Sequence, residues 1–208
     1  MSELPLVSVI AVCYNHAKYV VETLDSIKDQ TYPNIELIIM DDCSADNSVE
    51  VIQEWIDKNN YQCQFIAHKD NRGLCKTLNE ALGFIKGDYT QLIACDDVLV
   101  NNKFQIQVNA FNKADDTTLI CCSNYSHIDE NSDKIKEQFF GDDFIFPKNT
   151  FEAILNGSQG YGIIVHSPTV LVKSKAFRIV GLFNEDLIQE DLYMWLKITL
   201  NHKVVYVN

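Results

Sequence analysis

Short apolar runs alternate with helix-like patterns through the first half of the chain. Four runs have the length and β-branched composition of buried strands. Between them, apolar residues recur every three or four positions, which is the period of an amphipathic helix. Because strands that alternate with helices form right-handed crossovers, the pattern predicts an α/β fold with a doubly wound, mostly parallel sheet. The predicted strands are Val7–Cys13, Ile35–Met40, Cys63–His68 and Tyr89–Cys95, and the predicted helices are Ala17–Gln30, a segment through Val49, Ile52 and Ile56, a segment from Gly73 to Ile85, and Lys103–Lys113.

The second half of the chain is less regular. Asp129–Lys148 is polar and aperiodic, which indicates a functional loop or a poorly ordered excursion. Pro168 interrupts Ile163–Val172, and a proline favours an edge or bent strand over a central one. We predict a single domain over residues 1–208, with halves at 1–117 and 118–208, and expect it to be cut from a longer protein because it stops on a strand. The other predicted elements are the strand Thr118–His127, the helices Phe151–Leu155, Ser174–Val180 (ended by Gly181) and Glu190–Leu200, and the strand Lys203–Asn208.

Composition narrows the class of protein. The 208 residues are 47% hydrophobic and 22% charged, as in an ordinary globular domain. With 17 basic and 29 acidic residues, the net charge of −12 opposes binding to nucleic acid or to an anionic membrane surface. No apolar run approaches the roughly 20 residues that span a bilayer. The seven cysteines have no metal-binding spacing, and most lie in apolar runs, so they are expected to be reduced structural residues in the cytosol.

Two pairs of acidic residues stand where predicted strands end, Asp41-Asp42 and Asp96-Asp97. In an open parallel sheet this is the edge at which ligands bind. Paired carboxylates repel each other unless a cation or a hydrogen-bond donor offsets their charge. We therefore expect a nucleotide at the first pair and a metal-held diphosphate at the second. The alternative is that each pair only caps a turn or favours a helix N-terminus.

The usual phosphate-binding loops are absent from the sequence. There is no G-x-x-x-x-G-K-[ST], and no G-x-G-x-x-G follows the first strand, which argues against a P-loop kinase and a dinucleotide dehydrogenase. The chain instead resembles the family 2 inverting glycosyltransferases of GT-A fold over nearly all of its length. The motifs that carry this resemblance are Val7–Asn15, Leu24–Ile27, Gln30–Tyr32, Ile35–Asp46, Asn71–Gly73, Asn79–Leu82, Gly87–Tyr89, Asp96-Asp97, Gly181–Phe183, and Glu190-Asp191 with Trp195.

The resemblance implies roles for several residues around the donor. Tyr14 and Asn15 would line the nucleotide-sugar site. Asp42 would accept a hydrogen bond from the base, or else cap the helix that follows it. Arg72 would reach the base or the phosphates, or else be a solvated cation.

The same resemblance assigns a divalent metal, Mn²⁺ or Mg²⁺, to the second acidic pair. Asp96 would ligate the metal, and Asp97 would support it or hold the ribose or sugar. The first acid of the family's D-x-D signature is replaced here by Ala94, which bears on the donor sugar and on metal dependence.

On the acceptor side, Asp191 matches the family's general base, with Glu190 as the other candidate, and a helix N-terminal acid is the simpler alternative. Trp195 could stack on a sugar or lie in the core. His166 could be an acceptor-side residue or a core histidine. Gly157–Gly162 could be a moving lid or a plain turn, and the four other histidines, His16, His68, His127 and His202, are expected to be structural or at the surface.

The resemblance predicts inverting, metal-dependent transfer of a hexose or N-acetylhexosamine from a nucleotide sugar, a UDP-sugar, to a glycan or lipid-linked acceptor. The setting it suggests is surface polysaccharide synthesis in the cytoplasm, at the inner face of the membrane, with attachment through segments beyond residue 208. A nucleotidyltransferase would need a glycine-rich basic loop, and Tyr14–Ala17 does not supply one. The alternative from another class is a degenerate module that binds a nucleotide or glycan without catalysis.

Overall fold

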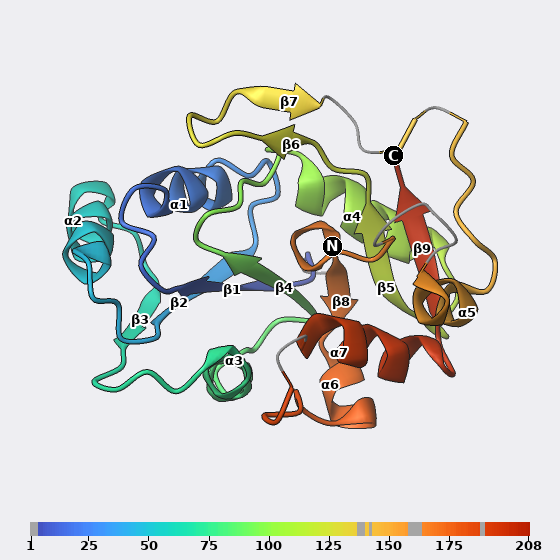
Figure 1. Cartoon of the computed structure of the whole chain (residues 1–208). Helices are drawn as coiled ribbons and strands as arrows, with labels where there is room; N and C mark the ends of the chain where they lie inside the picture. Colours follow the sequence, from blue (N-terminus) through green and yellow to red (C-terminus); the bar gives the residue numbers. More distant parts are fainter. Residues whose placement is uncertain (1–3, 137–139, 142, 158–163, 188–189) are drawn as a thin grey trace.

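The fold was obtained as a computed structural model, which describes residues 4–136, 140–141, 143–157, 164–187 and 190–208, apart from the side chain of Glu190. Its described strands form a seven-stranded sheet in the order β3-β2-β1-β4-β8-β5-β9 (Figure 1). All neighbouring strands pair in parallel except β8, which is antiparallel to β4 and β5. The predicted mostly parallel α/β sheet is thereby confirmed. The strands are β1 Val7–Cys13, β2 Ile35–Asp41, β3 Gln64–Ala67, β4 Tyr89–Ala94, β5 Thr118–Ser123, β8 Leu171–Lys173 and β9 Lys203–Val207.

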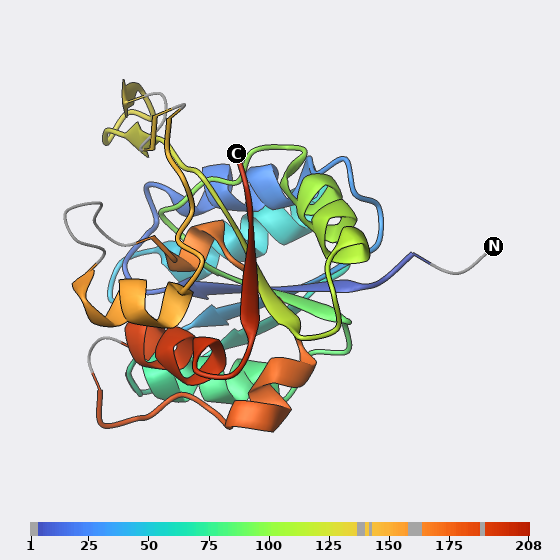
Figure 2. The same cartoon turned by 90° about the vertical axis from the view of Figure 1, so that its right-hand side faces the viewer.

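Helices cover both faces of the sheet (Figure 2). Side chains alternate along each buried strand, so that Val9 and Ala11 of β1 face one layer of helices while Ile10 and Val12 face the other. None of the described helices is both long and apolar enough to cross a bilayer. One layer holds α1 Val20–Lys28, α2 Ser48–Asn59 and α4 Lys103–Lys113, and the other holds α3 Leu74–Leu82, α5 Thr150–Leu155, α6 Lys175–Val180 and α7 Glu190–Thr199.

The prediction for β8 was wrong, because this strand lies inside the sheet. It pairs with β4 through Gln91–Leu171 and with β5 through Cys121–Leu171. Pro168 does not interrupt it, since the proline lies in a short 3-10 turn, η2 Ser167–Thr169, that precedes the strand. A proline in that position removes no hydrogen bond from the sheet.

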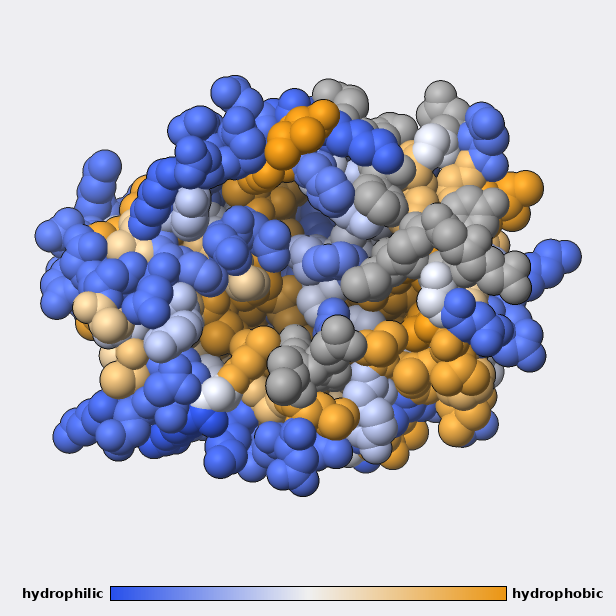
Figure 3. Space-filling model, viewed as in Figure 1, coloured by the Kyte–Doolittle hydropathy of each residue, from blue (hydrophilic) through white to orange (hydrophobic). Residues whose placement is uncertain are grey.

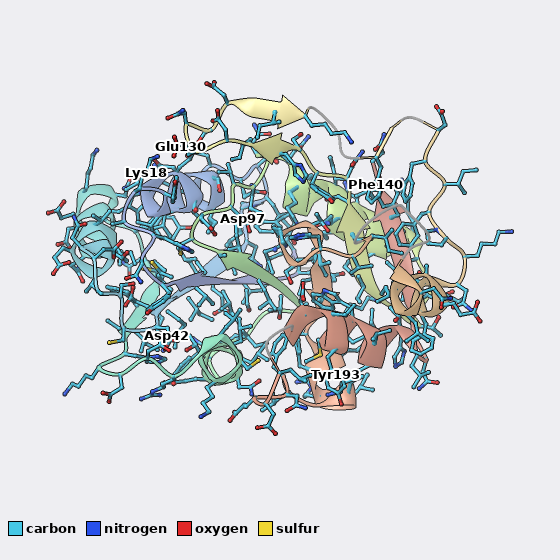
Figure 4. The ribbon with its side chains drawn as sticks, in the orientation of Figure 1. Lys18, Asp42, Asp97, Glu130, Phe140 and Tyr193 are labelled. Carbon is cyan, nitrogen blue, oxygen red and sulfur yellow. The ribbon has the colours of Figure 1, made fainter. Side chains whose placement is uncertain are left out.

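A small second sheet begins just before the segment predicted to be a loop, Asp129–Lys148, and extends into it. β6 His127–Ile128 pairs antiparallel with β7 Lys134–Lys136, and the hairpin lies beside α1 (Figure 1). The hydroxyl of Ser132 donates to the carboxylate of Glu22, and Lys18 Nζ lies 3.7 Å from Glu130 Oε2, a pair labelled in Figure 4. The predicted strand Thr118–His127 accordingly ends earlier, at Ser123 of β5.

The strand ends that carry the acidic pairs lie together. β1 pairs with β2 as far as Cys13–Asp41 and with β4 as far as Val12–Ala94. The backbone N–H of Asp42 continues the first ladder by donating to the carbonyl of Cys13 at 2.9 Å. Because β8 runs in the opposite direction, its beginning and the η2 turn reach this same edge of the sheet.

Candidate active site

A cleft of about 570 Å³ opens at the carboxyl edge of β1, β2 and β4. The space-filling view shows this face hollowed near its centre, with hydrophobic residues in the hollow (Figure 3). Both acidic pairs and the predicted base contribute one side chain each to its wall. The lining residues are Val12, Tyr14, His16, Asp42, Asn71, Gly73, Leu74, Leu78, Leu92, Ile93, Ala94, Asp97, His166, Ser167, Pro168, Phe183 and Asp191.

Asp42 presents a buried carboxylate to one end of the cleft, where Figure 4 labels it near β3 and α3. Its Oδ1 accepts from the backbone N–H of Arg72 at 2.8 Å and faces His68 Nδ1 at 3.0 Å, while Oδ2 accepts from the N–H of Gly73 at 2.8 Å. Burial raises the pKa of Asp42, but these hydrogen bonds outweigh it and hold the pKa below its usual value. The alternative role as a cap of α2 is wrong, because Asp42 holds the loop before α3.

Arg72 reaches the site through its backbone. Its half-exposed guanidinium is held by Glu80, with Nη1 donating to Oε2 at 2.5 Å. The same Oε2 lies 3.2 Å from Nε2 of His68, which therefore stands between two carboxylates. Arg72 does not line the cleft, and its predicted contact with a base or phosphate stays a prediction.

Tyr14 and Asn15 form the turn after β1, but only Tyr14 lines the cleft. Asn15 has a φ of 59°, in the left-handed region that asparagine tolerates. Its Oδ1 accepts from the N–H of Ala45 at 2.7 Å and its own N–H donates to Ser44 Oγ at 2.8 Å. Asp41 also serves this loop, accepting from the N–H of Ser44 at 2.8 Å. Asn15 and Asp41 therefore shape the loop that presents Tyr14.

The two acids after β4 face different spaces. Asp97, labelled near the end of β4 in Figure 4, lines the cleft, and burial together with the charge of Asp96 raises its pKa to about 6. Asp96 is exposed and lines a smaller cavity toward the β6–β7 hairpin, with Oδ2 lying 3.6 Å from Nε2 of His16. His16, which is partly exposed, also lines the cleft.

Of the Asp96-Asp97 pair, only Asp97 presents its carboxylate to the cleft, where a divalent cation would take it as one ligand and phosphate oxygens as others. No group of three or more His, Cys, Asp or Glu able to hold an ion alone occurs among the described residues. Mn²⁺ and Mg²⁺ commonly take one or two protein carboxylates and complete their shell with phosphate oxygens. The raised pKa of Asp97, caused by burial and by the neighbouring Asp96 charge, marks a site where a cation would relieve repulsion. Ala94, exposed at the cleft, adds no side-chain oxygen.

Asp191 lines the cleft from the first turn of α7. Its Oδ1 accepts from the N–H of Leu192 at 2.7 Å, and its Oδ2 accepts from the hydroxyl of Ser167, 3.2 Å away. Glu190, the other candidate base, begins the helix, and its side chain lies outside the described residues. A carboxylate in this position can receive a proton from a hydroxyl bound in the cleft.

Two residues expected on the acceptor side differ in their surroundings. His166 lines the cleft beside Tyr125, with 5.6 Å between ring centroids. Burial lowers the pKa of His166, opposed by the nearby charge of Asp191. Trp195 is 1% exposed and belongs to the core, so the expectation that it stacks on a sugar is wrong. One turn beyond Asp191, α7 packs against α5 and the sheet.

The predicted lid or turn, Gly157–Gly162, lies outside the described residues beyond Gly157.

Sequence reasoning missed Ser167, Asn71 and the apolar part of the wall. Leu74, Leu78 and Phe183 read as ordinary core positions in their own segments. They come together only because α3 and the loop before α7 meet beside the sheet. The sequence feature that could have identified Ser167 as a site residue is its position between His166 and Pro168, where the predicted strand is interrupted.

Comparisons with known proteins show which family the chain resembles. The family described as glycosyl transferase family 2 matches residues 8–178. An uncharacterized glycosyltransferase of Rickettsia felis is 34% identical over 198 residues, covering 93% of this chain and 31% of that protein. GlyG, a glycosyltransferase of Streptococcus pneumoniae, is 28% identical over 214 residues, covering 100% of this chain and 69% of its own length. The chain thus spans about a third of the first relative.

Solved structures show the same architecture. A mannosyltransferase of Pyrobaculum calidifontis in complex with GDP-Man and Mn²⁺ superposes with a TM-score of 0.72 at 20% identity, covering 99% of this chain and 55% of that one. TarS of S. aureus, residues 1–349, in complex with UDP-GlcNAc gives 0.72 at 19% identity, covering 97% and 56%. The predicted GT-A fold is confirmed by this likeness.

Proposed function

Because the chain belongs to glycosyl transferase family 2, we propose that it transfers a sugar from a nucleotide-sugar donor to a hydroxyl of a glycan or lipid-linked saccharide, with inversion at the anomeric carbon. The observation that carries the proposal is one cleft lined by Asp42, Asp97 and Asp191 together. Three carboxylates from separate strand and helix ends converge there on one space large enough for a small ligand.

The donor lies between Asp42 and Asp97 in this proposal. Oδ2 of Asp42 accepts from the N–H of Gly73, and a carboxylate oxygen, which has two lone pairs, can also accept from a base N–H. We infer a uridine diphosphate sugar, carrying a hexose or N-acetylhexosamine. The complex of TarS with UDP-GlcNAc supports this choice, while the GDP-Man complex of the mannosyltransferase keeps guanine as the competing base.

The diphosphate lies beside Asp97, with Tyr14 and His16 on the neighbouring wall. Asp97 and Asp96 would hold Mn²⁺ or Mg²⁺ there, and a bound cation would neutralise charge on the leaving diphosphate. At pH 7 Asp97, with a pKa of about 6, is mostly ionised and available as a ligand.

Asp191 acts as the general base. Its carboxylate accepts the proton of an acceptor hydroxyl held at about 2.6–3.2 Å. The hydroxyl oxygen forms a bond to the anomeric carbon from the face opposite the diphosphate. The bond from that carbon to the diphosphate oxygen breaks, and its electron pair leaves with the diphosphate. Attack from the opposite face gives inversion.

The cellular setting proposed for this reaction rests on the family resemblance alone. It is surface polysaccharide synthesis in the cytoplasm, at the inner face of the membrane. Fold and family do not fix the acceptor. The alternative of a non-catalytic module predicts nucleotide binding without turnover.

A nucleotide-sugar screen tests the proposal. We expect UDP-sugars with Mn²⁺ to raise the melting temperature of the chain, and to be cleaved slowly to UDP with water as acceptor. The sugar released at early times should have the inverted anomeric configuration by proton NMR. Absence of any nucleotide-dependent stabilisation would contradict the donor site. Stabilisation without cleavage, for every nucleotide sugar and acceptor offered, would instead favour the binding module.

A further inference from the structure

Ser167 contacts the proposed base from outside the helix that carries it. Its hydroxyl donates to Oδ2 of Asp191 with a separation of 3.2 Å, and both residues line the cleft. This is longer than an ordinary O–H···O bond, as catalytic contacts often are before substrate binds. The other oxygen of Asp191 accepts from the N–H of Leu192. Each carboxylate oxygen is therefore held by one donor, which limits rotation of the side chain.

The turn that carries Ser167 is anchored by buried side chains of α4. Pro168 fixes the backbone at the next position. The carbonyl of Thr169 accepts from Nε2 of Gln107 at 2.7 Å. Oε1 of Gln107 in turn accepts from Nζ of Lys103 at 2.6 Å, and both of these side chains are buried. A turn held by a buried polar network is a rigid support for the residue it presents.

We propose that Ser167 is a positioning residue, which holds the carboxylate of Asp191 in the orientation that receives the proton of the acceptor hydroxyl. The inference rests on the proposed function, in which Asp191 is the base. Misplacing a reacting group by about 1 Å can cost on the order of 100-fold in rate. Removing the hydroxyl should therefore slow the chemical step and leave donor binding, at the Asp42 and Asp97 end of the cleft, intact.

Three variants separate positioning from stability. Ser167→Ala removes the hydroxyl, and Ser167→Thr keeps it. Ser174→Ala is the matched control, because the Ser174 hydroxyl also hydrogen-bonds a side chain, Thr90, at 2.8 Å, but lies at the other end of β8 and away from the cleft lining. We expect Ser167→Ala to lower kcat about 10- to 100-fold with the Kd for UDP and Mn²⁺ within about twofold of wild type. Ser167→Thr should restore most of the activity, and Ser174→Ala should match wild type.

The kcat of a double variant separates a positioning role from a purely structural one. In the Asp191→Asn background, Ser167→Ala should cause no further loss, because both changes act on one step. A kcat within twofold of wild type for Ser167→Ala would overturn the inference. A double variant whose loss in kcat equals the product of the two single losses would overturn it as well.

A crystal structure of Ser167→Ala decides the same question without turnover. Rotation of the Asp191 carboxylate away from its wild-type position supports the inference, and an unchanged carboxylate overturns it. Wild-type protein that cleaves no nucleotide sugar would count against the proposed function, and the crystallographic result would still decide the role of Ser167.

Discussion

At the scale of single residues, two aspartates of the cleft have pKa values shifted in opposite directions. Asp42 is surrounded by donors that lower its pKa against the effect of burial, whereas burial and a second carboxylate raise the pKa of Asp97. The protein's own hydrogen-bond donors thus stabilise the negative charge of Asp42. The charge of Asp97 lacks this stabilisation, and in the proposed function a bound cation would provide it. Perturbed carboxylates of this second kind are typical of functional sites.

The uncompensated charge of Asp97 predicts a stability cost in the ligand-free protein. Its folded-state pKa of about 6 lies above the ordinary value of 3.8, so ionisation destabilises the fold above pH 6, and the cost disappears as the pH falls toward 4. Asp97→Asn should raise the free energy of unfolding at pH 7.5 by about 1–3 kcal/mol, measured by urea denaturation.

The gain from Asp97→Asn should shrink at pH 4.5, where the wild-type carboxyl is mostly protonated. Asp116→Asn, at an exposed aspartate remote from the cleft lining, is the control and should change little at either pH. Equal or lower stability of Asp97→Asn at pH 7.5 would show that the repulsion is already offset in the free protein.

Some site residues were predictable from sequence and others were not. Asp42, Asp97 and Asp191 follow strand ends or begin a helix, which are local signals. The fate of Trp195 depended on which side of α7 packs against α5, and this is a property of tertiary contacts. Ser167 required knowledge that β8 enters the sheet antiparallel, because only then does the η2 turn reach the cleft.

At the scale of elements, β1, β2 and β4 follow directly from their apolar patterns. β8 does not, because three residues beside a proline carry too little pattern to place a strand between β4 and β5. The β6–β7 hairpin was missed for the same reason, since its strands are short and exposed. Short elements are fixed by their neighbours in space rather than by their own sequence.

In the turn before β4, Gly87 leaves no room for a methyl group, so we expect its substitution by alanine to lower stability. A Cβ on Gly87 would lie 2.6 Å from Oγ of Ser8 and 2.7 Å from the carbonyl oxygen of Leu6. Backbone atoms cannot move aside without disturbing the β1–β4 pairing, so Gly87→Ala should destabilise the protein by about 2–4 kcal/mol in thermal or urea unfolding. Gly141→Ala, where nothing lies within 4 Å, should be nearly neutral. Matching stabilities for the two variants would contradict the close approach.

At the scale of the whole molecule, two apolar cores on opposite faces of one sheet hold the cleft at its carboxyl edge. The first core fixes α1, α2 and α4 around β1, and the second fixes α3 and α7. Asp97, which the proposed function places on the donor side, follows a strand end, and Asp191 comes from a helix of the second layer. This arrangement predicts that donor binding and proton removal can be disrupted separately.

Asp191→Asn therefore tests whether Asp191 removes the acceptor proton without binding the donor, with UDP binding measured by calorimetry in Mn²⁺ and sugar transfer measured on the same protein. Asp186→Asn, an exposed change in the loop before α7, is the matched control and should leave both unchanged. We expect Asp191→Asn to bind UDP within about twofold of wild type and to lose about 100- to 10,000-fold in kcat. A fully active Asp191→Asn variant, or one that has lost UDP binding, would contradict this expectation.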